Sequence, residues 1–316
     1  MKPYLKRAWA EISLSALEAN IRAISASLQG NTQIMAVVKA DAYGHGEAEI
    51  LQKLTQIGIR YFAVSNLDEA LHVRQYCPDS DVLILGYTPP EYADTLAQNN
   101  IIQGIVSAEY ACTLNARTRT PIRCHVKLDT GMGRIGITGD TPGDCADSIQ
   151  DMSFLRNLKI EGIYTHFAVA DMPDDPEQNA YTEAQKQFIR SVGTELMKRG
   201  VHLKHLHYLN SAGVLYHNDA NSTLARVGII MYGLAPNYPL PVPLDLKPVL
   251  SLKAVISHIK RVQPGTSISY GRTFQADHCM KIATVTVGYA DGYSRLLSSK
   301  ADVLVKGSSL HISLDA

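Results

Sequence analysis

The chain has 316 residues, of which 46% are hydrophobic and 19% are charged, and its formal net charge is zero. This balance is typical of a soluble globular protein, and the sequence lacks the excess of basic residues that a nucleic-acid-binding protein usually has. Five widely spaced cysteines form no CxxC pair, so we expect reduced thiols in a cytoplasmic protein. No apolar run approaches the length of a membrane-spanning helix, and the N-terminus lacks the apolar stretch of a signal peptide.

The first elements precede the main pattern of the chain. Residues 8–14 alternate between apolar and polar side chains, as a strand does. The following stretch, 16–28, predicts a helix, and Ser15 and Glu18 match a capping box at its start.

Between residues 30 and 235, short apolar runs alternate with amphipathic stretches. Eight runs predict strands: 34–38, 61–64, 82–86, 101–106, 123–128, 160–165, 205–209 and 224–232. Intervening stretches such as 47–57, 67–76 and 176–199 predict helices. Strands that are almost continuously apolar and alternate with helices are typical of a parallel sheet. Eight such units predict a (β/α)8 TIM barrel, with a doubly wound open sheet as the competing fold.

A proline-rich segment at 234–248 interrupts this pattern. It holds five of the fourteen prolines and predicts a stiff linker. The β-branched runs after it are bounded by Gly, Asp and Ser and predict a small all-β domain. We therefore place the barrel at 12–236, the linker at 237–244, and a partial β domain at 1–11 together with 245–316.

The predicted strand at 34–38 ends at Lys39, where the chain enters a glycine-rich turn. A lysine at the mouth of a buried strand is costly unless it has a partner or a reaction to perform. Burial would free its amine as a nucleophile, although a lysine that merely extends to solvent is an equal alternative at this position. Strand ends of a barrel form one rim. Further polar residues lie at later strand ends: Lys127, Arg134, His166, Asn210, Ser211 and Arg226.

Two other patterns lack the context that their ligands need. GMGRIG at 131–136 fits the dinucleotide fingerprint GxGxxG, but it runs into turn residues instead of opening a helix. His205 and His207 share one face of an alternating strand, but no nearby carboxylate or cysteine completes a zinc site. We therefore expect neither a dinucleotide nor a metal.

Seven segments resemble, in order, motifs of the alanine racemases. They are VVKADAYGHG (37–46), KLDTGMGRIG (127–136), YTHFAVAD (164–171), NSA (210–212), ARVGIIMYG (225–233), ISYGRTF (268–274) and TVGYADGYSR (286–295). The resemblance covers nearly the whole chain. It implies a pyridoxal-phosphate-dependent homodimer of fold type III that interconverts L- and D-alanine and supplies D-alanine for peptidoglycan.

The resemblance also implies roles for single residues. Lys39 holds the cofactor as a Schiff base and acts as one base, while Tyr270 of the partner subunit acts as the second. Arg134 binds the substrate carboxylate, and carbamylation of Lys127 would hold that arginine in place. The remaining cofactor-binding residues are Tyr43, His166, Asn210, Ser211, Arg226, Gly228 and Ile229. Among these, Arg226 faces the pyridine nitrogen, and His166 links it to its surroundings.

The chain departs from the family pattern near its end. Family members continue past residue 316 with more of the β domain, so we expect a truncated β domain here. Three alternatives stay open: a pyridoxal-phosphate-binding carrier, a catalytically impaired truncated homologue, and a serine racemase.

Overall fold

The structure is a computed structural model that describes residues 7–237 and 243–311. Two compact units make up the chain: one is Ser13–Val249, and the other joins Met1–Ile12 to Leu250–Ala316. Residues 238–242 of the predicted linker lie outside the described residues. Within the described ranges, no helix is both long and apolar enough to cross a membrane.

Eight parallel strands form the sheet of the first unit, in the order β8-β7-β6-β5-β4-β3-β2-β9. They are β2 (Gln33–Val37), β3 (Tyr61–Val64), β4 (Asp81–Ile84), β5 (Ile101–Ile105), β6 (Ile122–Lys127), β7 (Leu158–Tyr164), β8 (His205–His207) and β9 (Leu224–Val227). The Thr223 N–H donates to Leu206 O at 2.8 Å, and the Arg226 N–H donates to Leu209 O at 2.9 Å. These bonds join the two ends of the sheet, so the predicted (β/α)8 barrel is confirmed.

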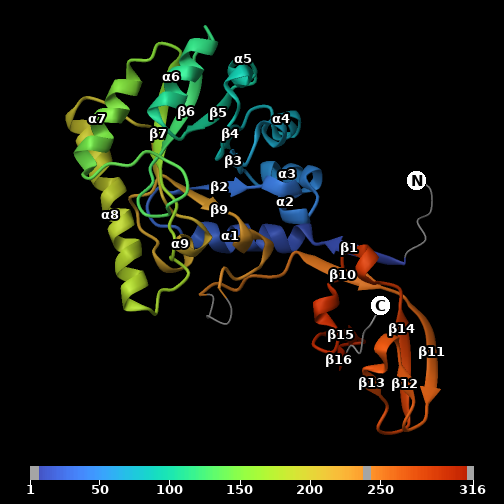
Figure 1. Ribbon diagram of the computed structural model, residues 1–316. Coiled ribbons are helices and arrows are strands. Elements are labelled where there is room, and N and C mark those ends of the chain that lie inside the picture. Colours follow the sequence, from blue (N-terminus) through green and yellow to red (C-terminus); the bar gives the residue numbers. More distant parts are fainter. Residues whose placement is uncertain (1–6, 238–242, 312–316) are drawn as a thin grey trace. The chain divides into compact units, whose positions relative to one another are not determined.

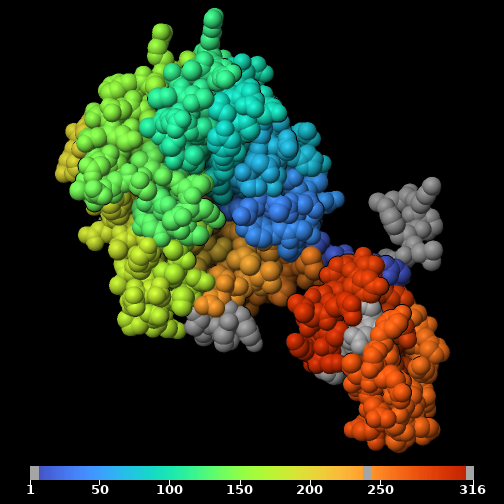
Figure 2. All heavy atoms as spheres, viewed as in Figure 1, coloured from blue at the N-terminus to red at the C-terminus, as the bar shows by residue number. Residues whose placement is uncertain are grey.

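Helices connect the strands and lie outside the barrel (Figure 1). They are α1 (Leu14–Ser27), α2 (Lys39–Gly44), α3 (Glu47–Gln56), α4 (Leu67–Tyr76), α5 (Ala93–Gln98), α6 (Ala108–Arg117), α7 (Pro142–Ser153), α8 (Pro176–Lys198) and α9 (Ser211–Tyr216), with the 3-10 turns η1 (Pro90–Tyr92) and η2 (Ile229–Tyr232). Figure 2 shows the side chains of this unit, coloured from blue to orange, packed against one another.

Two predicted boundaries are wrong. Helix α1 begins at Leu14, and its N-cap is Ser13, whose side chain accepts a hydrogen bond from the Ala16 N–H. The predicted cap, Ser15, therefore lies inside the helix. The predicted strand at 224–232 stops at Val227, because the backbone leaves the extended conformation at Gly228 (φ −114°, ψ −103°) and continues as η2.

The strands of the barrel bury two different sets of side chains. Six apolar residues pack together: Met35, Val37, Ala63, Leu83, Ile102 and Leu224. Strands β6 to β9 instead bury the polar or aromatic side chains of His125, Lys127, Tyr164, His205, His207 and Arg226. Because buried polar groups are costly without partners, this second set must be organised by specific hydrogen bonds.

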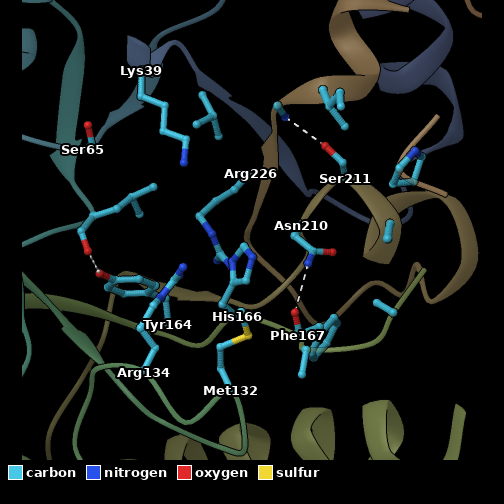
Figure 3. Close-up of a pocket in the computed structure, with 18 of the residues that line it drawn as sticks. Lys39, Ser65, Met132, Arg134, Tyr164, His166, Phe167, Asn210, Ser211 and Arg226 are labelled. Atoms are coloured by element: carbon cyan, nitrogen blue, oxygen red, sulfur yellow. Dashed lines mark hydrogen bonds between the residues drawn. The ribbon is translucent and has the colours of Figure 1, made fainter. Parts of the chain in front are cut away.

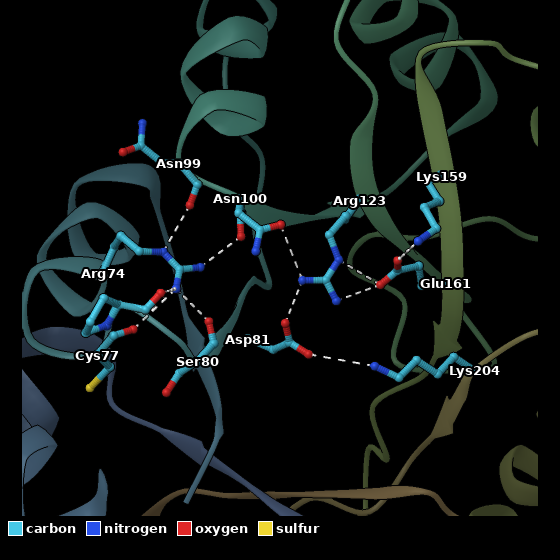
Figure 4. A network of polar contacts seen from close by, with 11 residues as sticks. Arg74, Cys77, Ser80, Asp81, Asn99, Asn100, Arg123, Lys159, Glu161 and Lys204 are labelled. Carbon is cyan, nitrogen blue, oxygen red and sulfur yellow. Dashed lines mark hydrogen bonds and ion pairs between the residues drawn. The ribbon is translucent and has the colours of Figure 1, made fainter.

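Charged side chains pair with one another near the N-terminal ends of β4, β6 and β7 (Figure 4). Arg123 contacts Asp81 at 2.5 Å and Glu161 at 2.7 Å, and Glu161 also contacts Lys159 at 2.7 Å. Burial opposes ionisation of Glu161, but hydrogen bonds from Arg123 and Lys159 outweigh it and lower the pKa of its carboxyl to about 2. The charges at this end of the barrel therefore compensate one another.

The second unit consists of antiparallel strand pairs. Strand β1 (Ala8–Ile12) pairs with β10 (Leu250–Ala254), β11 (Ile256–Val262) with β14 (Met280–Val285), β12 (Ser267–Ile268) with β13 (Phe274–Gln275), and β15 (Asp302–Val305) with β16 (Ser308–His311). Three 3-10 turns lie between them: η3 (Tyr270–Arg272), η4 (Tyr289–Asp291) and η5 (Arg295–Leu297). The predicted all-β character of this part of the chain is confirmed.

Candidate active site

A cavity of about 550 Å³ lies at the C-terminal ends of the barrel strands, and all its lining residues belong to the first unit. Ten predicted site residues line it: Lys39, Tyr43, Lys127, Arg134, His166, Asn210, Ser211, Arg226, Gly228 and Ile229. Figure 3 shows several of them directed at a common space. The eleventh, Tyr270, belongs to the second unit, where its side chain is 78% exposed.

Lys39 begins a turn of unusual handedness. Ala40, Asp41, Ala42 and Tyr43 have φ angles of 52°, 53°, 54° and 57°, which are left-handed values. A left-handed turn costs about 1–2 kcal/mol for each residue that carries a Cβ. The glycine-rich turn expected here is thus made of four non-glycine residues, and its surroundings must stabilise it.

Glu69 provides part of that stabilisation. Its Oε1 accepts a hydrogen bond from the Ala40 N–H at 2.8 Å, and its Oε2 accepts from both the N–H and the hydroxyl of Ser65 at 2.7 Å. Burial opposes ionisation of Glu69, but these N–H groups outweigh it and lower the pKa of the carboxyl. An ionised carboxylate from α4 therefore connects the turn after β2 to the end of β3.

Replacing Glu69 with alanine is expected to destabilise the protein by about 1–3 kcal/mol, because the Ala40 and Ser65 N–H groups lose their acceptor. Calorimetric unfolding measures the loss. Asp68→Ala, on the first turn of the same helix, is the matched control, since it removes a neighbouring charge without touching the turn. Equal melting temperatures for the two variants would show that Glu69 does not hold the turn.

Hydroxyl and backbone groups gather where the first and last strands of the barrel meet. Gly228 donates its N–H to Ser211 Oγ at 3.1 Å. A Cβ added at Gly228 would lie 2.8 Å from the Tyr43 hydroxyl, so a larger residue would displace that hydroxyl. The Tyr43 ring lies 5.3 Å from that of Tyr232, which also stacks on His45. The arrangement forms a small cradle of donors.

The loop after β6 carries Arg134 to the cavity. Asp129 organises it: Oδ1 accepts from the N–H groups of Gly131 (3.1 Å) and Gly133 (2.9 Å), and Oδ2 accepts from the Arg134 N–H (3.0 Å). Both glycines have positive φ angles, 129° and 69°. After β6 ends at Lys127, the next helix of the described chain begins at Pro142, so GMGRIG lies in a loop. Along the described chain the Arg134 guanidinium has no hydrogen-bond partner, which leaves its donors available to a ligand.

Arg226 is buried without a carboxylate partner in the part of the chain that the structure describes. Its guanidinium donates instead to neutral acceptors, namely the carbonyl oxygens of Thr165, His207 and Tyr208 and the Nδ1 of His207. Burial lowers its pKa to about 10, so it remains a cation at neutral pH. Within the described residues, the hydrogen bonds of Arg226 do not include the His166 ring; the imidazole that contacts the guanidinium is that of His207.

Positive charge dominates the cavity. Lys39, Lys127, Arg134 and Arg226 line it, and Asp171 carries the one carboxylate among its described lining residues. Burial and the nearby Arg226 lower the pKa of Lys127 to about 8, and the same causes lower that of His166 to about 3. His166 is therefore neutral in the working range. Such a cavity suits a small ligand with more than one anionic group.

Sequence reasoning missed several residues that position the site. Glu69, Asp129, His207 and Tyr164 were not predicted, although Tyr164 opens the YTHF segment. Tyr164 is buried, its ring stacks on that of His207, and its hydroxyl donates to Leu85 O at 3.2 Å. All four act through neighbours, and their roles depend on contacts between distant parts of the chain.

Two family models match the chain. The alanine racemase N-terminal domain matches residues 12–236, and the alanine racemase C-terminal domain matches 249–313. The chain belongs to the alanine racemase family. An alanine racemase from Desulfovibrio desulfuricans is 39% identical over 95% of this chain and 80% of its own length. An amino-acid racemase from Enterococcus faecalis is 37% identical over 96% of this chain and 43% of its own length.

A solved alanine racemase from Clostridium difficile 630 has the same fold, with a TM-score of 0.87 at 34% identity. The match covers 98% of this chain and 80% of that one. The predicted family is thereby confirmed, and the match at 249–313 shows that the C-terminal domain of alanine racemases is represented in this chain. Membership over both domains favours an enzyme over a single-domain carrier.

Proposed function

We propose that this protein is a pyridoxal-phosphate-dependent racemase that interconverts L- and D-alanine. The observation that carries the proposal is the convergence of Lys39, Arg226, Arg134 and a hydroxyl-lined cradle on one cavity. The family's racemases support the same reaction. Bound pyridoxal phosphate would supply an electron sink that acidifies the α-hydrogen of an amino acid.

The residues present fit this cofactor. The Tyr43 and Ser211 hydroxyls, with the backbone at Gly228 and Ile229, would hold its phosphate, and the space left by the absent Cβ of Gly228 supports this assignment. Lys39 would hold it covalently. Arg226 would face the ring nitrogen as a permanent cation that cannot accept a proton. Asn210 caps α9 through the Gly213 N–H, which would keep Ser211 in position, and neutral His166 would line the same space.

Arg134 would bind the carboxylate of the substrate. A guanidinium offers two parallel donors to a carboxylate, which fixes the orientation of the amino acid. Its guanidinium has no partner among the described residues, and this and its place beside the cavity support the role. Lys127 would act through Arg134 after carbamylation, because a carbamate is an anion that can receive the arginine's remaining donors.

Racemisation needs a proton removed from one face of the α-carbon and returned to the other. Lys39 would serve one face, and Tyr270 of the partner subunit in a homodimer would serve the other. The exposure of Tyr270 supports a role toward a second chain, as does its position on η3, where Ser269, Gly271 and Arg272 all have positive φ angles. We also assign the protein to the cytoplasm and to D-alanine supply for peptidoglycan; its five free cysteines suit a reducing compartment.

Purified protein supplied with pyridoxal phosphate and L-alanine tests the proposal. Circular dichroism should show the optical activity decaying toward zero as D-alanine accumulates, and chiral chromatography should identify the product. L-serine assayed in parallel ranks the two substrates, and we expect alanine to be faster. A protein that binds the cofactor but leaves L-alanine unchanged would be a carrier or an impaired homologue instead.

Carbamylation of Lys127 gives a separate prediction with a pH dependence. Only the neutral amine reacts with carbon dioxide, and a pKa of about 8 leaves roughly a tenth of Lys127 neutral at pH 7. With ¹³C-labelled bicarbonate we expect one carbamate signal in ¹³C NMR, which strengthens as the pH rises from 6 to about 8. The signal should vanish in Lys127→Gln and persist in Lys159→Gln, which alters an exposed lysine. A signal unchanged in Lys127→Gln would place the modification elsewhere.

A further inference from the structure

Three buried histidines lie behind Arg226, and the proposed reaction uses none of them directly. His125 and His207 are 0% exposed and His205 is 6% exposed. The His207 ring lies 5.1 Å from that of His125, and the His125 ring lies 5.4 Å from that of His205. No carboxylate or thiol joins them to form a metal site within residues 7–237 and 243–311. Their polar atoms therefore need another explanation.

The hydrogen bonds determine which nitrogen of each ring carries the proton. An arginine can only donate, so Nδ1 of His207, 2.9 Å from the Arg226 guanidinium, must accept. A neutral His207 then carries its proton on Nε2, which lies 3.0 Å from Nδ1 of His125. His125 accepts there and must in turn carry its proton on Nε2. Every proton in this series points away from Arg226.

At the end of this series that is farthest from Arg226, His125 neighbours the ring of His205. Nε2 of His125 and Nε2 of His205 are both buried, and neither has a hydrogen-bond partner among the described residues. Nδ1 of His205 lies 3.5 Å from the Thr223 hydroxyl, which donates to Leu206 O at 3.2 Å. The hydroxyl can therefore accept from His205, which leaves Nε2 of His205 as an acceptor, whereas Nε2 of His125 is a donor.

Gly162 makes the room that these rings occupy. A Cβ added there would lie 2.9 Å from the Cβ of His205 and 3.1 Å from Cδ2 of His125. The two rings thus approach each other across a position that holds no side chain. A buried donor and a buried acceptor on neighbouring rings, both without a partner among the described residues, are groups that a single bound water can join.

We propose that His207, His125 and His205 form a one-way chain of hydrogen bonds that positions Arg226 and stabilises its charge, with one water joining His125 to His205. In such a chain each neutral ring turns its lone pair toward the guanidinium, so that the aligned dipoles favour the cation. A carboxylate at the place of His207 would also hold the arginine, but it would cancel the positive charge that faces the cavity. The three histidines are positioning residues, and the inference does not depend on which amino acid is racemised.

The proposed hydrogen-bond chain forms only if its three imidazole rings are neutral. Burial, reinforced by Arg226 beside His207, lowers the pKa of His207 well below its ordinary value. Burial lowers the pKa of His125 to about 3 and that of His205 to about 4. The charged groups that face them are Arg226 at one end and Arg123, Glu161, Asp81 and Lys204 at the other. The proton pattern should therefore be constant from about pH 6 upward.

Nitrogen NMR of the holoenzyme with ¹⁵N-labelled histidine tests the pattern without an activity assay. We expect His207 and His125 as the Nε2–H tautomer and His205 as the Nδ1–H tautomer, all unchanged between pH 6 and 9. Single replacements by leucine assign the signals. A protonated, charged ring, or an Nδ1–H tautomer at His207 or His125, would overturn the proposal. A high-resolution crystal structure should show a water bonded to both Nε2 atoms; an apolar gap there would also contradict it.

A pair of variants separates positioning from packing. His207→Asn keeps an acceptor at the position of Nδ1, whereas His207→Leu removes it. We expect His207→Leu to lower kcat about 10- to 100-fold, the size expected for the loss of a hydrogen bond to a charged group, and His207→Asn to restore most of it. The visible spectrum of the bound cofactor should shift in the leucine variant only. His217→Leu, which removes another buried imidazole, is the control and should change neither. Equal kcat values and spectra for the asparagine and leucine variants would refute the proposed role of the chain.

Discussion

Replacing Lys39 with alanine is expected to abolish racemisation, with a loss of at least about 10,000-fold in kcat. A general base alone contributes about 100- to 10,000-fold, and Lys39 is proposed to hold the cofactor as well. The visible absorption band of covalently held pyridoxal phosphate should disappear from the variant. Optical rotation of L-alanine and the absorption spectrum measure the two losses separately.

Lys198→Ala removes an exposed lysine of α8 and serves as the control for this experiment. It should leave both readouts unchanged. A Lys39→Ala protein that keeps the absorption band would place the covalent link at another lysine. The candidate would be Lys127, the only other lysine among the described residues that line the cavity. That result would require the roles of these two side chains to be exchanged.

Replacing Tyr270 with phenylalanine is expected to lower kcat about 100- to 10,000-fold while leaving the cofactor bound. The change removes one hydroxyl and keeps the ring, so an exposed side chain should lose little stability. In deuterated solvent, the α-hydrogen of one enantiomer should still exchange, because Lys39 reaches that face alone. Proton NMR of each enantiomer measures the exchange.

Tyr289→Phe is the matched control, since Tyr289 is another exposed tyrosine on a short turn of the same unit. It should retain full activity. Loss of exchange for both enantiomers in Tyr270→Phe would indicate a structural role for Tyr270. Full racemisation by that variant would show that another group returns the second proton.

Much of the barrel could be predicted from the sequence because its signals are local. Each strand is a short apolar run, and polar residues such as Lys39 and Asn210 directly follow such runs. In a parallel barrel the strand ends must share one rim, so these positions grouped seven residues around one cavity, and the family resemblance added Tyr43, Gly228 and Ile229. Because the strand ends alone locate those seven residues, that part of the site could be predicted without knowing how the helices pack.

The handedness of the turn after Lys39 could not be predicted. Ala40 and Ala42 favour a right-handed helix by themselves, and only tertiary contacts such as the carboxylate of Glu69 impose the opposite hand. The histidine chain escaped prediction for a related reason. His205 and His207 were considered only as metal ligands, and His125, the residue between them in space, lies 80 positions or more away in sequence.

The ion pairs at the N-terminal ends of the strands have a consequence for mutational scanning of this protein. Arg123, Asp81 and Glu161 neutralise one another far along the strands from the cavity, so their replacement should reduce how much folded protein a cell accumulates. Among the described residues, Lys39 and Arg134 at the opposite end have no carboxylate partner and are not buried, so their replacement should leave the amount of folded protein unchanged while growth that demands the product fails. A scan that reads abundance and growth separately should therefore find positions that lose both near the N-terminal ends of the strands, and positions that lose growth alone among the accessible cations of the cavity.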